Sequence, residues 1–224
     1  MPEATLTRTE ASAAVEDIGW RFLLGTLAVS VPVHSLLQGA ALAARVVDIC
    51  GEDAEGHLRV DVRRDRVELV LRSQSAGGAT RRDVELAKAI TAALGQAALA
   101  PPTDVDRPVQ ALEIAIDAMD IEAIRPFWRA VFAYADEGTG EYAELVDPVR
   151  QGPTVWFQQM DAPRPQRNRI HFDVTVPHDE ADRRVKAALD AGGVLVSDAY
   201  ARSFWVLADA EGNEVCVCTW QDRE

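Results

Sequence analysis

Apolar and polar residues alternate most clearly between residues 169 and 176. Successive side chains of a β-strand point to opposite faces, so this segment predicts a half-buried strand whose polar face carries Arg169, His171 and Asp173. Residues 112–117 alternate in the same way, and an offset of 58 superposes Glu113 on His171 (171 − 113 = 58). In the amphipathic segments that follow, the same offset pairs Glu122 with Glu180, Ala123 with Ala181, Arg125 with Arg183 and Ala130 with Ala188. The repetition predicts two copies of a strand-and-helix unit related by a pseudo-twofold axis.

The rest of the second half completes each copy with further strands. In chain order the pattern predicts strand 111–117, helix 121–132, short strands within 134–152, strand 154–159, strand 169–176, helix 179–191 and strands 194–197, 204–208 and 214–219. Pro126 lies inside the first of these helices, where it predicts a kink or a later start. The expected order is therefore βαβββ, twice.

Short strands and two capped helices are expected in the first half of the chain. Residues 19–24 and 27–31 predict two strands, residues 57–63 and 66–71 a hairpin, and residues 36–47 and 84–94 two helices. The pairs Ser35 with Gln38 and Thr80 with Asp83 have the spacing of capping boxes at the helix starts. Residues 1–16 carry few large apolar side chains and predict a flexible lead-in that is frayed or partly helical, and the proline-rich segment 97–108 predicts a linker. Two domains are expected, at 17–96 and 109–224.

Charge and cysteine content narrow the classes of partner and compartment. The 224 residues carry a formal net charge of −13, whereas binding to phosphate backbones needs clustered Lys and Arg, so a nucleic-acid partner is not expected. Cys216 and Cys218 stand two positions apart on a predicted strand, a spacing that suits neither a mutual disulfide nor a metal knuckle. Cysteines without a disulfide framework fit a reducing compartment, so a cytoplasmic protein is expected. The apolar run 22–49 is interrupted by residues such as Pro32 and Arg45, so no export or membrane segment is expected.

The first half resembles the pterin-4a-carbinolamine dehydratases over residues 17–95. The resemblance rests on the Gly19-Trp20 opening, the helix 36–47, the hairpin, the Gly77-Gly78 pair and the helical run Arg82-Asp83-Val84-Glu85-Leu86-Ala87. In that family a His-His-Pro-Asp run and a Thr-His-Asp run supply histidines that flank the pterin and move protons. This chain has Gly56-His57-Leu58-Arg59 and Ser73-Gln74-Ser75 at those places, so it retains one histidine, His57. Glutamine exchanges no proton at neutral pH, and the resemblance therefore implies the fold more firmly than the activity.

The second half resembles the vicinal oxygen chelate superfamily, in its glyoxalase-like and bleomycin-resistance-like branch, over residues 109–221. The βαβββ repeat, the run Asn168–Val174 and the closing run Asp209–Val217, with its Gly-Asn-Glu, carry the resemblance. It implies two sheets around a cleft, with metal ligands at Glu113, His171 and Glu214. One imidazole and two carboxylates suit Fe(II), Mn(II) or Mg(II) better than structural zinc. Strand parity independently places Glu113 and His171 opposite the large apolar residues of their own strands.

The expected fold class is α+β: a dehydratase-like antiparallel sheet with helices on one face, followed by a paired βαβββ glyoxalase-like domain. Ligand-binding candidates on the cleft face are Trp156, Gln158, Asp173 and Arg169, and the catalytic candidates are His57 and His171. Each candidate also has an interpretation without a functional role. His57 would be a surface residue at the start of a strand, and His171 a hydrogen-bond partner of Asp173. Arg169, together with Arg164 and Arg167, would be part of a solvated connector.

Three functions follow from these expectations. The first is a small-molecule enzyme or binder that uses the C-terminal cleft, with one divalent metal (Fe, Mn, Mg or Zn) and glyoxalase-like lyase, isomerase or dioxygenase chemistry. The second is an active 4a-hydroxytetrahydrobiopterin dehydratase, and the third a protein that sequesters a ligand without catalysis. The short sheet of the first half has edges that need cover, and relatives of both halves pair, so a homo-oligomer is expected.

Overall fold

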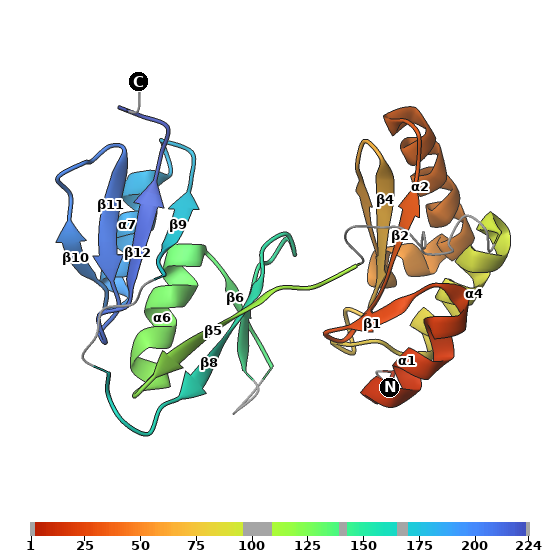
Figure 1. Ribbon diagram of the computed structural model, residues 1–224, viewed down its shortest axis with the longest axis horizontal. Helices are drawn as coiled ribbons and strands as arrows, with labels where there is room; N and C mark the ends of the chain where they lie inside the picture. The colour runs from red at the N-terminus through yellow and green to blue at the C-terminus, as the bar shows by residue number, and fades with distance from the viewer. Residues whose placement is uncertain (1–2, 96–108, 139–142, 165–169, 223–224) are drawn as a thin grey trace. The chain divides into compact units, whose positions relative to one another are not determined.

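The computed structural model describes residues 3–95, 109–138, 143–164 and 170–222 (Figure 1). The chain divides into two compact units, Met1–Ala111 and Leu112–Glu224, which are described separately. None of the helices in these described segments has the length and apolarity that a membrane crossing needs.

The N-terminal unit is an antiparallel sheet with helices packed on one face. Its elements are α1 (Arg8–Val15), the 3-10 turn η1 (Glu16–Ile18), β1 (Arg21–Leu23), β2 (Thr26–Pro32), α2 (Leu36–Cys50), the 3-10 turn η2 (Gly51–Asp53), α3 (Ala54–His57), β3 (Leu58–Val62), β4 (Arg66–Leu71) and α4 (Arg81–Leu94). The strand order is β1-β2-β4-β3. Alternate residues of β4 are buried because they face the helices, and their neighbours face away.

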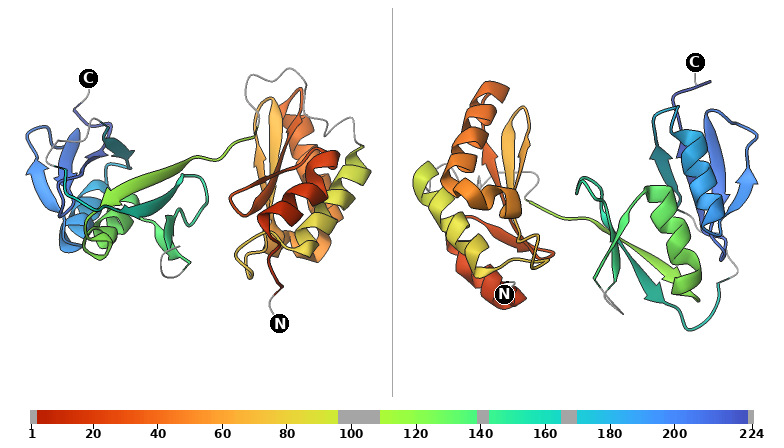
Figure 2. Two further views of the ribbon diagram at one scale, coloured as in Figure 1. Left: turned by 60° about the horizontal axis from the view of Figure 1, so that its bottom comes forward. Right: turned by 180° about the vertical axis from the view of Figure 1, so that it is seen from behind.

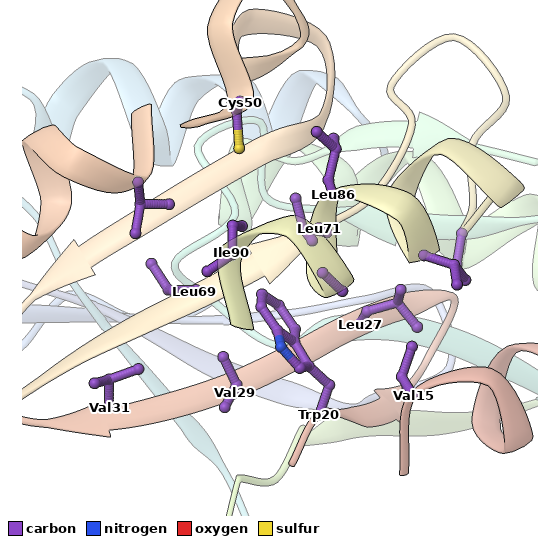
Figure 3. Close-up of a cluster of buried hydrophobic side chains, with 14 of the residues drawn as sticks. Val15, Trp20, Leu27, Val29, Val31, Cys50, Leu69, Leu71, Leu86 and Ile90 are labelled. Carbon is purple, nitrogen blue, oxygen red and sulfur yellow. The ribbon is translucent and has the colours of Figure 1, made fainter. Parts of the chain in front are cut away.

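The core of this unit lies between the central strands and α4 (Figure 3). Leu27 of β2 pairs in register with Leu71 of β4, and Ile90 of α4 packs in the same cluster. Trp20 is fully buried there, and its indole Nε1 donates to Thr91 Oγ1 at 3.0 Å. The largest core side chain is therefore both packed and hydrogen-bonded.

Two local details differ from the sequence-based expectations for this unit. Residues 1–16, expected as a frayed or partly helical lead-in, contain α1, which is packed and not frayed: it begins with a capping box between Thr7 and Glu10 and buries Ala11 and Val15 in the core. These side chains are small, so the segment shows little of the apolar bulk by which a packed helix is recognised in sequence. His57 ends α3 instead of opening a strand.

The C-terminal unit consists of two modules with the same topology. The elements of the first module are β5 (Glu113–Ala118), α6 (Ile121–Phe132), β6 (Ala135–Glu137), β7 (Glu144–Val146) and β8 (Thr154–Gln159), and those of the second are β9 (Phe172–Thr175), α7 (Ala181–Asp190), β10 (Val194–Ser197), β11 (Phe204–Ala208) and β12 (Glu214–Cys218). The sheet orders are β5-β8-β7-β6 and, read from its other edge, β9-β12-β11-β10. In both sheets the first and last strands of the module pair in parallel. The expected βαβββ repeat is present, and α6 starts at Ile121 with Pro126 inside the helix.

The two modules share one hydrophobic core. Helices α6 and α7 lie beside each other (Figure 2), and the core cluster takes side chains from both sheets. Trp128 of α6 donates its indole N–H to Asp209 of the second module at 2.9 Å. The carboxylate of Glu211 accepts from the backbone N–H groups of Met119 and Asp120, just before α6, at 2.9 and 2.7 Å. The turn between β11 and β12 therefore holds the first module's helix at its start.

Candidate functional site

Register in the first module places several predicted site residues on one face of the sheet. Strands β5 and β8 pair in parallel, with Glu113 opposite Thr154 and Ala115 opposite Trp156. Paired residues project from the same face, and alternate residues along a strand share that face, so Glu113, Trp156 and Gln158 project together. The intervening residues, such as Ile116 and Phe157, belong to the core.

A cavity of about 1040 Å³, which we call the β8 cavity, adjoins these residues. Its lining comprises Glu113, Met119, Asp120, Ile121, Glu122, Arg125, Pro126, Arg129, Asp136, Ala143, Glu144, Trp156, Phe157, Gln158 and Gln159. Strand β7 pairs with β8 at Leu145 and Val155. Beyond Val155, β8 has β5 on one side and, within the described residues, no ladder partner on the other. Residues from both faces of β8 can therefore line one cavity at this edge.

The guanidinium groups of the cavity lining are already engaged. Arg125 donates from Nε to Asp136 Oδ1 at 2.8 Å, from Nη1 to the carbonyl of Ala143 at 3.0 Å and from Nη2 to that of Glu144 at 2.9 Å. Arg129 donates to the other oxygen of Asp136 at 2.6 Å. The hydrogen bonds from Arg129 and then Arg125 lower the pKa of the Asp136 carboxyl, which stays ionised between them.

In the second module, His171 directly precedes β9 and lies near Asp173 of that strand. His171 Nε2 lies 3.7 Å from Asp173 Oδ1, and both side chains are 58% exposed. Asp173 pairs in register with Cys216 of β12. Burial raises the pKa of the Cys216 thiol to about 11, and the neighbouring Asp173 carboxylate adds to the effect. Cys216 was not among the predicted site residues, although the 58-residue offset would have aligned it with Gln158 (216 − 158 = 58).

The predicted metal ligands do not form one ligand set. Glu113 belongs to the sheet of the first module, whereas Glu214 begins β12 and His171 adjoins β9 in the sheet of the second. Across residues 3–95, 109–138, 143–164 and 170–222, no three His, Cys, Asp or Glu side chains lie close enough together to hold a metal ion. These residues therefore do not fit the implied metal, and no chemical step is assigned to one. Arg169 lies outside the described residues.

In the N-terminal unit, His57 is paired with a buried carboxylate. His57 Nδ1 lies 2.9 Å from Asp83 Oδ1, and the side chains are 13% and 0% exposed. The other oxygen of Asp83 accepts from Thr80 N at 2.7 Å and from Thr80 Oγ1 at 2.9 Å, which completes the capping box of α4. Asp83 therefore caps the helix, as predicted, and also orients His57, a role the sequence pattern did not reveal. A carboxylate at Nδ1 favours the tautomer that leaves Nε2 as the proton acceptor.

The two segments that stand at the places of the dehydratases' histidine runs, Gly56–Arg59 and Ser73–Ser75, lie side by side next to this pair. The backbone N–H of Gln74 donates to the carbonyl of Gly56 at 2.9 Å, and the Gln74 side chain donates to the carbonyl of Glu55 at 3.2 Å. Arg72 N donates to the carbonyl of His57 at 2.9 Å. The fold therefore brings together the positions of the family's histidines, with glycine and glutamine at two of them.

Comparisons with known proteins match both units. Residues 4–93 match the family model described as pterin 4 alpha carbinolamine dehydratase, and residues 113–218 match the model of a glyoxalase-like domain. A protein of Mycobacterium avium (strain 104), named "Putative pterin-4-alpha-carbinolamine dehydratase", is 33% identical over 93 residues, which are 41% of this chain and 98% of that protein. A protein of the same name from Mycolicibacterium vanbaalenii is 34% identical over 93 residues, 41% of this chain and 99% of that protein.

Solved structures similar to the chain include a glyoxalase-related enzyme from Fulvimarina pelagi, with a TM-score of 0.41 at 18% identity over 49% of this chain and 87% of that one. The fosfomycin resistance protein FosX from Listeria monocytogenes has a TM-score of 0.42 at 11% identity over 53% of this chain and 96% of that one.

The fold and its two sites define an α+β protein of two units, one with a His–Asp pair at a hairpin and one with a duplicated βαβββ module. The chain belongs to the pterin-4a-carbinolamine dehydratase family through residues 4–93, and it continues into a glyoxalase-like domain at residues 113–218.

Proposed function

We propose that the protein binds a small organic molecule in the β8 cavity of its glyoxalase-like domain. The observation that carries the proposal is a cavity of about 1040 Å³ beside a half-buried tryptophan and a glutamine amide at alternate positions of β8, on one face of the sheet. Ligand sites of soluble proteins have volumes of about 300–1,000 Å³ and combine apolar surface with a few placed polar groups. The Trp156 ring offers a stacking surface, and the Gln158 amide offers one acceptor and two donors.

The test is a ligand-observed NMR screen of a fragment library against the full-length chain and two tryptophan variants. Trp156→Ala removes the stacking surface, and we expect it to weaken cavity ligands by roughly tenfold. Trp220→Ala is the matched control, because Trp220 is 64% exposed and does not line the cavity. Fragments that lose binding in W156A and keep it in W220A support the proposal. A screen in which no fragment depends on Trp156 would refute it.

A second candidate function, slow dehydration of a pterin carbinolamine, is favoured by the His57–Asp83 pair. In this reaction the carbon–oxygen bond breaks, the hydroxyl group leaves as water with a proton from an acid, and a base takes the proton of the ring nitrogen as the C=N bond forms. His57 can supply one of these two proton transfers, whereas Gln74 can supply neither. We therefore propose that the N-terminal unit turns over carbinolamine well below the rate of an ordinary dehydratase.

The assay follows dehydration of 4a-hydroxytetrahydrobiopterin by the wild type and by His57→Ala. We expect a low rate that the substitution lowers further. A rate close to that of an ordinary dehydratase, abolished in H57A, would contradict the proposed weakness and identify the chain as a working dehydratase. A rate in wild type equal to the uncatalysed one would remove this second function.

A further inference from the structure

We propose that the β8 cavity selects an organic cation, such as a primary ammonium group attached to an aromatic or other apolar body. This inference rests on the proposed binding function and specifies the charge of the ligand. It is carried by three features of the described lining: the balance of charges, the engagement of both arginines, and the proximity of a carboxylate to an aromatic ring.

The first feature is the excess of acidic groups. Carboxylates outnumber guanidinium groups by five to two in the lining, with Glu113, Asp120, Glu122, Asp136 and Glu144 against Arg125 and Arg129. A cleft lined by one sign of charge concentrates ligands of the opposite sign. An anionic ligand would therefore meet repulsion on entry, and a cation would be attracted.

The second feature is that both arginines already donate to groups of the protein, Arg125 through all three of its guanidinium nitrogens. Asp136 accepts from both guanidinium groups, and Arg125 also donates to the carbonyls of Ala143 and Glu144. The Arg125 guanidinium also lies 5.5 Å from the centroid of the Phe157 ring, so one of its faces is covered. An anion would have to displace these contacts before it could pair with Arg125.

The third feature is the position of Glu113 relative to Trp156. Glu113 pairs in register with Thr154, so Trp156 is its diagonal neighbour on the same face of the sheet. With strands about 4.8 Å apart and a rise of about 3.3 Å per residue, diagonal neighbours of a parallel pair have Cα atoms roughly 8 Å apart, a separation that one ammonium group can bridge between a carboxylate and an indole face. A cation held there gains both ion pairing and a cation–π contact, and a neutral or anionic analogue gains neither.

The experiment uses three naphthyl probes of similar size and different charge: 1-naphthylmethylamine, 1-naphthylmethanol and 1-naphthoate. Their affinities for the full-length chain are measured by isothermal titration calorimetry at low and high NaCl. We expect the ammonium probe to bind at least about fivefold more tightly than the alcohol, and the carboxylate more weakly than both. The advantage of the ammonium probe should shrink at high salt, because exposed charges are screened.

Two variants locate the effect. Glu113→Gln keeps the shape of the side chain and removes its charge, and should cost the ammonium probe about fivefold and the alcohol almost nothing. Asp182→Asn is the control: Asp182 is an exposed acid in the first turn of α7 and does not line the cavity. It should change neither affinity.

The outcomes distinguish failure of the cation preference from failure of the proposed ligand binding. If all three probes bind equally, or the carboxylate binds best, and Trp156→Ala weakens them, the cavity binds ligands and the cation preference is wrong. If the ammonium probe is preferred but E113Q and D182N weaken it equally, the preference reflects the overall negative charge and the assigned site is wrong. If no probe shows binding that depends on Trp156, both proposals fail.

Discussion

Asp209 is expected to contribute more to the stability of the C-terminal unit than any exposed acid, because four hydrogen-bond donors converge on it. It is 2% exposed. Its oxygens accept from Trp128 Nε1 at 2.9 Å, from the backbone N–H groups of Glu211 and Asn213 at 2.9 Å each, and from Asn213 Nδ2 at 2.8 Å. Replacing it with alanine removes all four acceptor contacts at once.

The size of the effect follows from which donors water can reach. Trp128 is 1% exposed, so its N–H would stay buried without an acceptor, at about 1–3 kcal/mol. The donors in the turn are part-buried, and each lost bond there costs about 0.5–1 kcal/mol. We therefore expect Asp209→Ala to lower the free energy of unfolding of the C-terminal unit by about 3–5 kcal/mol, a large part of the 5–15 kcal/mol typical of a domain.

Urea denaturation of the full-length chain, followed by tryptophan fluorescence, measures this change. Trp128→Phe keeps most of the apolar ring and removes its N–H, so the double variant D209A/W128F should be less destabilised than the sum of the two single variants. The difference isolates the indole–carboxylate bond. A loss below about 1 kcal/mol in D209A, or strict additivity in the double variant, would refute the reasoning.

Three further predictions concern other parts of the chain. Gly193→Ala should lower the free energy of unfolding by about 1–3 kcal/mol, because the new Cβ would overlap the Phe127 ring and lie 2.8 Å from the carbonyl of Ala188. Gly56→Ala is the control, because a Cβ there meets open space. Equal thermal stability of the two variants would contradict the prediction. Cys216, with a pKa of about 11, should be alkylated slowly at pH 8, and the alkylation rate should rise about tenfold per pH unit until near pH 11. Peptide mass mapping measures this rate. A rate that levels off near about pH 8.5, the ordinary pKa of a cysteine thiol, would contradict the prediction. The protein should self-associate through α2, where Leu37 is 83% exposed with Val47 on the same helix, and Leu37→Asp should yield monomers by light scattering; a wild type already monomeric at tens of micromolar would count against it.

Much of the secondary structure could be predicted because its signals are local. Strand 154–159 matches β8 residue for residue, and Thr80 with Asp83 forms the predicted capping box. The 58-residue offset also predicts two modules, whose sheet orders agree. Alternation and capping depend on neighbouring residues, so a single sequence carries them.

The site was less predictable because it depends on how separate strands are placed. Strand parity identifies the face on which Glu113 or His171 lies, but it contains no information about the distance between two sheets. The three proposed metal ligands accordingly have the right parity and do not form a set. The pairing of His57 with Asp83 joins residues 26 positions apart through the packing of α4, which no local pattern encodes.

The contacts between the turn before β12 and the first module also determine the order in which the two units can fold during translation. The core of the N-terminal unit draws on residues up to Leu94, so it can close while the rest of the chain is still being translated. The first module has no such independence, because the acceptor for Trp128 is Asp209, and the acceptor for the backbone before α6 is Glu211. After β5 to β8 have been translated, the shared hydrophobic core is still incomplete. A nascent chain stalled before residue 209 would therefore expose apolar side chains of the first module to chaperones and proteases.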